Sequence, residues 1–215
     1  VEALLAEADL DAADALVAKM QERMKALKVG HFADAGNDFG PVITKAHQEK
    51  VCGYIDSAEA QGAEIVVDGR GVQVQGFENG FYVGGTLIDR VTPEMTCYQE
   101  EIFGPVLLVV RAGSMREAMQ LIDDHEYGNG TCIYTRDGEA ARYFSDNIQV
   151  GMVGINVPLP VPVSYHSFGG WKRSLFGDLA AYGPDAVRFY TKRKTVTQRW
   201  PSAGVREGAQ FSFPS

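Results

Sequence analysis

The sequence lacks the long apolar runs and the cysteine pairs that are typical of membrane proteins and disulfide-stabilised proteins. None of its apolar runs approaches the roughly 20 residues that a membrane-spanning helix needs. Its three cysteines are odd in number and widely spaced, which predicts no disulfide framework and favours a reducing compartment. The opening VEALLAEADLDAADALV is acidic, so no signal peptide is predicted. These absences favour the cytoplasm, or the mitochondrial matrix in a eukaryote, and no membrane partner.

Several motifs of common enzyme classes are also missing. The sequence has no G-x-G-x-x-G, no Walker A loop, no G-x-S-x-G and no C-x-x-C, and its four histidines show no H-x-x-x-H spacing. A zinc site or a serine hydrolase site would need residues that the chain does not offer at recognisable spacing, so no metal site is predicted. The formal net charge of −8 argues against nucleic acid as the main partner.

The sequence does contain alternating helix and strand patterns. With 45% apolar residues in 215, it can build one large domain or a domain with an appendage. The chain is expected to open directly into helical sequence. Apolar periodicity and capping residues predict helices over 12–28, 45–61, 114–124 and 138–146. Strands are predicted over 64–67, 72–75, 81–88, 106–111, 131–135 and 151–156. The alternation from 106 to 156 predicts an α/β fold with a parallel sheet.

Two local patterns depart from that alternation. Asp68–Gly71 reads DGRG and predicts a tight hairpin turn between the first two strands, because Asp-Gly tolerates positive φ. After Asn156, alternate prolines from Pro158 to Pro162 predict an extended segment. A short helix is predicted near 178–187, and a strand rich in β-formers and bases over 190–200.

The stretch CYQEEIFGPVL, residues 97–107, carries the main functional signal. Gly104-Pro105 stiffens the backbone after Phe103, so Glu101 and Phe103 are held on a rigid turn before a strand. A carboxylate beside an aromatic ring can grip a nucleoside, since its two oxygens accept from ribose hydroxyls while the ring lies against the sugar and base. The alternative is that Glu100 and Glu101 merely solvate a loop.

These residues resemble a known family. Glu-Glu-Ile-Phe-Gly-Pro-Val, residues 100–106, is similar to the signature of aldehyde dehydrogenases. Further segments resemble that family in the expected order, namely FGPVI (39–43), YGNG (127–130), VGIN (153–156), SFGGWK (167–172) and KTVT (194–197). The resemblance covers roughly 12–200. Asn156–Val163 and Asp178–Lys194 look most like the coenzyme-A-acylating methylmalonate-semialdehyde branch.

The resemblance implies an aldehyde dehydrogenase-like catalytic domain, NAD as cofactor, coenzyme A as co-substrate and a small semialdehyde as substrate. Glu101 then accepts from the nicotinamide ribose hydroxyls, and Phe103 packs on the nicotinamide end. Phe168 lines the aldehyde tunnel, with a simple core contact as the equal alternative. The strand at 190–200 adds to a neighbouring subunit's sheet in a homo-oligomer, a dimer or a tetramer. Its alternative is an ordinary edge strand protected by basic residues.

The resemblance also implies that the catalytic nucleophile is not among these residues. The family's cysteine stands in a G-Q-x-C context that would precede Val1, so no catalytic residue is assigned here and the chain by itself is expected to be inactive. Cys52, Cys97 and Cys132 are predicted to be small apolar side chains. Two alternatives remain: a fragment of another aldehyde dehydrogenase with a different substrate, and a non-catalytic assembly module that holds the arm.

The implied organisation has three parts. Residues 1–156 form the C-terminal part of the catalytic α/β domain, 157–189 form the tunnel loop and connecting segment, and 190–215 form the oligomerisation arm and tail.

Overall fold

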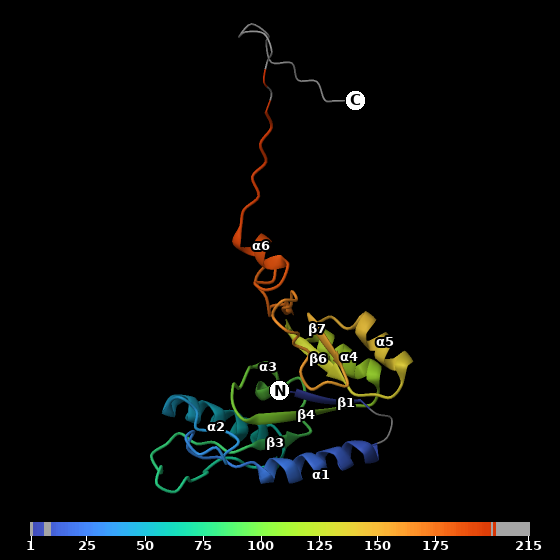
Figure 1. Ribbon diagram of the computed structural model, residues 1–215. Helices are drawn as coiled ribbons and strands as arrows, with labels where there is room; N and C mark the ends of the chain where they lie inside the picture. Colours follow the sequence, from blue (N-terminus) through green and yellow to red (C-terminus); the bar gives the residue numbers. More distant parts are fainter. Residues whose placement is uncertain (1, 7–9, 199, 201–215) are drawn as a thin grey trace.

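The computed structural model describes residues 2–6, 10–198 and 200, and its centre is a four-stranded sheet in the order β1-β4-β3-β2 (Figure 1). The strands are β1 (Glu2–Ala6), β2 (Glu64–Val67), β3 (Thr86–Asp89) and β4 (Val106–Ala112). Both β1 and β3 run parallel to β4, and β2 runs antiparallel to β3. The predicted α/β fold with parallel strands is therefore confirmed, although the parallel neighbours of β4 lie outside the run 106–156 that suggested it.

Helices cover both faces of this sheet, and β4 shows why. Leu108 and Val110 point into a core built with α2 (Lys45–Ala60) and the short α3 (Thr96–Gln99). Leu107 and Val109 point the other way, against α1 (Leu10–Ala26). Because successive side chains of a strand point to opposite faces, a strand between two helical layers must be apolar throughout. Figure 1 shows α1 running along one side of the sheet.

A second group of elements packs beside this sheet. It contains α4 (Met115–Asp124), α5 (Gly138–Asn147) and the parallel pair β6 (Gly130–Ile133) and β7 (Met152–Ile155). Met119, Phe144, Ile148 and Val150 form its small core. The predicted run of strands from 106 to 156 is thus divided between two sheets. A further antiparallel pair joins β5 (Tyr127–Gly128) to β8 (Trp171–Lys172).

The helix predictions agree closely with the structure. Thr44 caps α2 by accepting from the His47 N–H at 3.1 Å, and Ser114 caps α4 by accepting from the Glu117 N–H at 3.2 Å. Gly62 follows α2 with a φ of 98°, a conformation that glycine adopts without steric cost. The buried residues of α2 are Val51, Tyr54, Ile55 and Ala58, as its apolar periodicity predicts.

The predicted hairpin at Asp68–Gly71 is wrong. β2 pairs instead with β3, and 72–75 is loop. Arg70 explains the difference, because its guanidinium contacts Asp68 beside it and Asp56 and Glu59 on α2. These hydrogen bonds raise the pKa of Arg70 above its usual value. The turn is therefore held against α2, and it does not return the chain into an adjacent strand.

The expectation of a helical opening is also wrong. Residues 2–6, EALLA, pair with β4 along their whole length as β1, from Glu2 opposite Leu108 to Ala6 opposite Ala112. Such a sequence has good helix propensity, but pairing with a buried strand outweighs that weak local preference.

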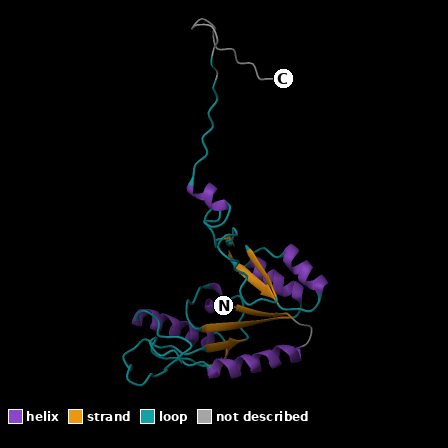
Figure 2. Ribbon diagram, in the orientation of Figure 1, coloured by secondary structure: helices purple, strands orange, loops and turns teal. Residues whose placement is uncertain are grey.

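The C-terminal part projects from the body of the molecule (Figure 2). The short helix lies at Asp185–Tyr190, α6, later than predicted. Residues 191–198 are extended and exposed, and they form no strand within this chain. A strand needs a partner for its backbone groups, and the described part of the chain supplies none here. Within the described ranges, no helix is both long and apolar enough to span a membrane.

A buried ion pair fixes the end of the central sheet. Asp89 ends β3 with only 2% of its surface exposed, and it receives two hydrogen bonds from Arg111 of β4, from Nε at 3.1 Å and Nη2 at 2.6 Å. Arg111 also reaches Asp14 of α1 at 2.7 Å. The bond to Asp89, followed by that to Asp14, raises the pKa of Arg111. One guanidinium thus joins both central strands to the helix below them.

This arrangement predicts unequal effects for the two aspartates. Asp89→Ala leaves the Arg111 charge partly buried without its main partner and should lower the free energy of unfolding by about 3–5 kcal/mol. Asp14 is the matched control, because its side chain is 65% exposed, and Asp14→Ala should cost about 1 kcal/mol or less. Urea denaturation measures both, and equal losses would contradict the assigned role of Asp89.

Candidate cofactor loop and substrate hollow

The loop over residues 100–105 joins α3 to β4 and alternates between the core and the solvent. Ile102 is 8% exposed and belongs to the main core. Its neighbours Glu101 and Phe103 are exposed, Phe103 to 76%. The loop therefore presents a carboxylate and a phenyl ring on its outer side while an apolar side chain anchors it from within.

Phe103 has an unusual backbone conformation. Its φ is 55°, in the left-handed region that costs a non-glycine residue about 1–2 kcal/mol. Such strain persists only where the surroundings enforce it, and it concentrates at functional sites. Phe103 therefore combines a strained backbone with a large apolar ring that is 76% exposed.

Contacts with α2 enforce this conformation. The Tyr54 hydroxyl donates to Glu100 Oε2 at 2.5 Å. A side chain at Gly104 would place its Cβ 2.8 Å from Val51 Cγ2, so only glycine lets the loop lie this close to α2. Ile102 and Gly104 thus lie against the core, and Glu100, although exposed, is bonded to α2, so the three alternate residues restrain the direction of Glu101 and Phe103.

Glu101 itself has no partner in the described part of the chain: it makes neither a hydrogen bond nor an ion pair there. Its two oxygens can therefore accept from a ligand. His47 of α2 lies beside Phe103, with ring centroids 6.3 Å apart. The site combines an acceptor, an apolar ring and a neighbouring imidazole, which suits a polar aromatic ligand that carries hydroxyl groups.

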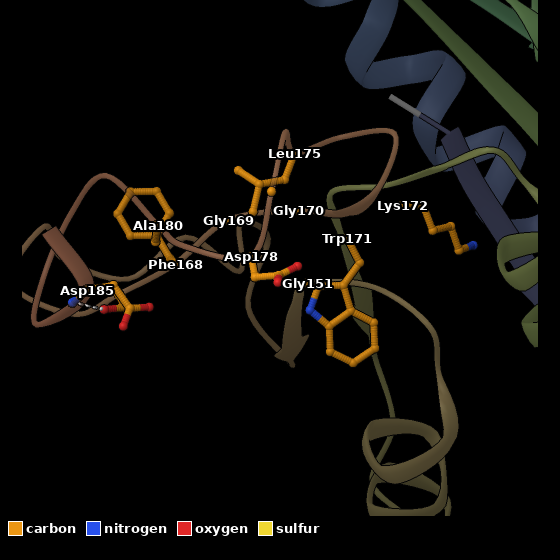
Figure 3. A pocket seen from close by; sticks show the side chains of 12 residues that line it. Gly151, Phe168, Gly169, Gly170, Trp171, Lys172, Leu175, Asp178, Ala180 and Asp185 are labelled. Carbon is orange, nitrogen blue, oxygen red and sulfur yellow. Dashed lines mark hydrogen bonds between the residues drawn. The ribbon is translucent and has the colours of Figure 1, made fainter. Parts of the chain in front are cut away.

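Phe168 lies elsewhere, in a hollow of about 610 Å³ within the C-terminal segment (Figure 3). Its ring stacks on Tyr182, with centroids 5.2 Å apart and planes 1° from parallel. Trp171, Leu175 and Asp178 also line the hollow, whereas Glu101 and Phe103 do not. The structure thus places Phe168 on the wall of a cavity of ligand size, but it does not bring the two predicted sites together.

Two polar side chains hold the walls of this hollow. Ser167 Oγ donates to the Tyr182 carbonyl at 3.2 Å and accepts from the Asp185 N–H at 3.1 Å. The Lys172 ammonium points away from the hollow and donates to the carbonyls of Ile122, Asp123 and His125 at 2.8–3.0 Å. These carbonyls lie at the end of α4, where helix geometry leaves them without partners. Lys172 therefore fastens the wall of the hollow to α4.

The cysteines have the environments of structural residues. Cys97 is 1% exposed within the main core. Burial and then the nearby Asp56 raise the pKa of the Cys52 thiol, which disfavours the reactive thiolate. Cys132 is half-buried on β6. Within the residues that the structure describes, no three acidic, histidine or cysteine side chains gather as metal ligands would.

A sequence profile of the aldehyde dehydrogenase family matches residues 6–196. The chain belongs to that family. Malonate-semialdehyde dehydrogenase of Pseudomonas aeruginosa is 71% identical over 203 residues, covering 94% of this chain and 41% of the relative. The bovine mitochondrial methylmalonate-semialdehyde/malonate-semialdehyde dehydrogenase (acylating) is 46% identical over 197 residues, with 92% and 36% covered.

Solved structures agree. The crystal structure of methylmalonate-semialdehyde dehydrogenase from Oceanimonas doudoroffii is 78% identical with a TM-score of 0.87, covering 96% of this chain and 42% of that one. A Sinorhizobium meliloti protein crystallised with NAD is 51% identical with the same TM-score of 0.87, covering 94% and 41%. This member of the aldehyde dehydrogenase family therefore spans about two fifths of the length of the relatives it matches, and the family resemblance read from the sequence is confirmed.

Sequence reasoning missed several residues that shape these sites. Tyr54 was predicted only as part of an apolar face, because periodicity says nothing of where a buried hydroxyl points. Tyr182 and Lys172 act over distances in sequence that no local pattern reveals. The doublet Glu100-Glu101 offered one local signal. Two adjacent side chains on an extended backbone face opposite ways, so if Glu101 points outward, Glu100 is directed toward the protein and can find a partner there.

Buried and exposed residues alternate in the loop, so truncating Ile102 and truncating Phe103 should change the free energy of unfolding by very different amounts. Ile102→Ala removes buried carbon atoms and should lower the free energy of unfolding by about 2–5 kcal/mol. Phe103→Ala should change it by no more than about 0.5 kcal/mol, because the ring is mostly exposed. Chemical denaturation of both variants gives the comparison. A large loss for Phe103→Ala would mean that its ring supports the fold, contrary to its exposure.

Proposed function

We propose that this chain supplies the nicotinamide-ribose clamp of an NAD-dependent, coenzyme-A-acylating methylmalonate- or malonate-semialdehyde dehydrogenase. The observation that carries the proposal is Glu101, an exposed carboxylate without a protein partner, beside the strained and exposed ring of Phe103. The printed names of the relatives support the substrate class, and the NAD complex of the Sinorhizobium meliloti protein supports the cofactor.

The residues present fit such a cofactor. Glu101 can accept from two neighbouring ribose hydroxyls at once, which fixes the sugar in position and orientation. Phe103 can cover one side of the ring next to that sugar and keep water from it. NAD, when bound, accepts a hydride, and the role of the clamp is to hold the accepting ring still, because small displacements of positioned groups reduce rates steeply.

Phe168 belongs to this proposal as a wall of the semialdehyde tunnel. The hollow that it lines is large enough for a small ligand, and its lining includes the aromatic ring of Trp171 and two carboxylates, Asp178 and Asp185. We assign coenzyme A as the acceptor of the acyl group from the word "acylating" in the bovine relative's name. The catalytic thiol is not assigned to any residue of this chain.

We also propose that the chain has three parts, a catalytic part over 1–156, a tunnel and connecting segment over 157–189, and an oligomerisation arm and tail over 190–215. Residues 191–198 extend from the body without a partner among the residues that the structure describes, so their backbone groups can pair with a second copy in a homo-oligomer. The alternative is that the arm packs as an ordinary edge strand in the complete protein. We place the complete enzyme in the cytoplasm, or in the mitochondrial matrix in a eukaryote, as the name of the bovine relative suggests.

A second candidate function is a non-catalytic assembly module, which the exposed arm favours. One test concerns the missing nucleophile. The 215-residue chain, given NAD, coenzyme A and malonate semialdehyde, should produce no NADH above the blank, because none of its three cysteines stands in the G-Q-x-C context of the family's nucleophile. Absorbance at the NADH band measures this. Sustained turnover would overturn the assignment of the nucleophile to another part of the enzyme.

In the full-length protein, Glu101→Gln should weaken NAD binding about tenfold and slow hydride transfer, because a hydrogen bond to a charged acceptor contributes about 1.5–3 kcal/mol. Calorimetric titration with NAD and single-turnover NADH formation measure the two effects. Glu139→Gln on α5 is the control, since it makes the same change on an exposed helix outside the loop. Unchanged affinity and rate in Glu101→Gln would remove the basis of the clamp.

A further inference from the structure

The loop that carries Glu101 and Phe103 is attached to α2 by polar contacts as well as by packing. The Tyr54 hydroxyl donates to Glu100 Oε2 at 2.5 Å. About two turns further along, at the C-cap of α2, Gln61 exchanges two hydrogen bonds with Thr96, each 3.0 Å long. The Gln61–Thr96 pair holds the start of α3, and the Tyr54 bond holds Glu100, the residue directly before Glu101.

We propose that Tyr54 is a positioning residue for the cofactor, acting through Glu100 to fix the direction of Glu101. The inference rests on the proposed function of Glu101 and adds a residue on a different helix to that function. Tyr54 touches neither a substrate nor a cofactor in this arrangement, and its effect passes through one hydrogen bond and one peptide unit.

The backbone geometry transmits the constraint. Glu100 has φ −113° and ψ 144°, an extended conformation. Successive side chains of an extended chain point to opposite sides, so holding Glu100 against α2 directs Glu101 outward. On the other side, Ile102 is fixed in the core. Glu101 therefore lies between two anchored residues, one polar and one apolar.

The hydrogen bond is suited to this role. Tyr54 is 7% exposed, so its ring is held by the core of α2, and Lys50 Nζ lies 5.4 Å from the ring centroid. The bond to Glu100 raises the pKa of the Tyr54 hydroxyl, which therefore keeps its proton near neutral pH. A charged acceptor at 2.5 Å makes a bond stronger than one between neutral groups.

Deleting the Tyr54 oxygen should leave the packing intact. The Tyr54–Glu100 contact borders a hollow of about 270 Å³ that is also lined by Lys50, Gly53, Ser57 and Thr96. Tyr54→Phe therefore removes one atom next to existing space and keeps the ring in the core. Loss of the bond leaves the Glu100 side chain with no anchor on α2, and Glu101 loses one of its two restraints.

The experiment uses the full-length enzyme. Tyr54→Phe should weaken NAD binding about tenfold, since a misplaced positioned group can lose up to about 100-fold. KM for NAD should rise in parallel, while KM for malonate semialdehyde stays within about twofold of the parent value. Tyr98→Phe is the matched control, because it removes another core hydroxyl, one that donates to the Leu121 carbonyl at 3.2 Å. A loss of the same size in Tyr98→Phe would show a general effect of core tyrosines and overturn the inference.

A double-mutant cycle tests whether Tyr54 acts through Glu100. Glu100→Ala, which removes the acceptor, should itself weaken NAD binding several-fold, and Tyr54→Phe in that background should add no more than about twofold. Equal effects of Tyr54→Phe in both backgrounds would overturn the inference. If Tyr54→Phe fails to fold, Glu100→Ala alone carries the test, and unchanged NAD affinity in that variant overturns the inference.

The outcomes also separate this inference from the proposed function. If Glu101→Gln weakens NAD binding and Tyr54→Phe does not, the clamp stands and the positioning role falls. If Glu101→Gln has no effect, the clamp falls, and the positioning role falls with it.

Discussion

The burial of β4 on both faces is the constraint on which the rest of the structure depends. β4 lies between β1 and β3, one of its faces packs on α1, and the other contributes to the core with α2 and α3. A strand enclosed in this way cannot shift its register without moving apolar side chains to the wrong helix. The loop over 100–105 leads directly into this strand, so the C-terminal end of the loop is fixed by the core. The positions of Glu101 and Phe103 on the outer side of the loop therefore depend on the packing of the core.

The loop shows how a stable core can present strained and exposed groups. Left-handed backbone at Phe103 is unfavourable in isolation. Ile102 in the core, Gly104 against Val51 and Glu100 on Tyr54 offset that cost from the side that faces α2. The groups that anchor the loop and the groups that it exposes thus alternate along one short segment.

Much of this could be read from the sequence, and the exceptions have physical causes. Helix limits, the caps Thr44 and Ser114 and the buried face of α2 follow from local periodicity, because packing against one layer produces it. The exposed positions of Glu101 and Phe103 on a fixed turn agree with their rigid Gly-Pro context, and their role stays a prediction. The strand β1 and the turn at Asp68–Gly71 were misread because a distant partner decided them, β4 in one case and the acidic side of α2 in the other. Tyr54, Tyr182 and Lys172 were missed for the same reason, since each acts on a residue far along the chain.

The three bonds of Lys172 limit the chemistry of the neighbouring hollow. An ammonium group has three protons, and here all three are directed at backbone carbonyls at the end of α4. None is left to neutralise an anion. The hollow next to it is lined by Asp178 and Asp185. The lining that the structure describes therefore offers an entering carboxylate two negative charges and no free ammonium proton, and it disfavours an anion at this wall.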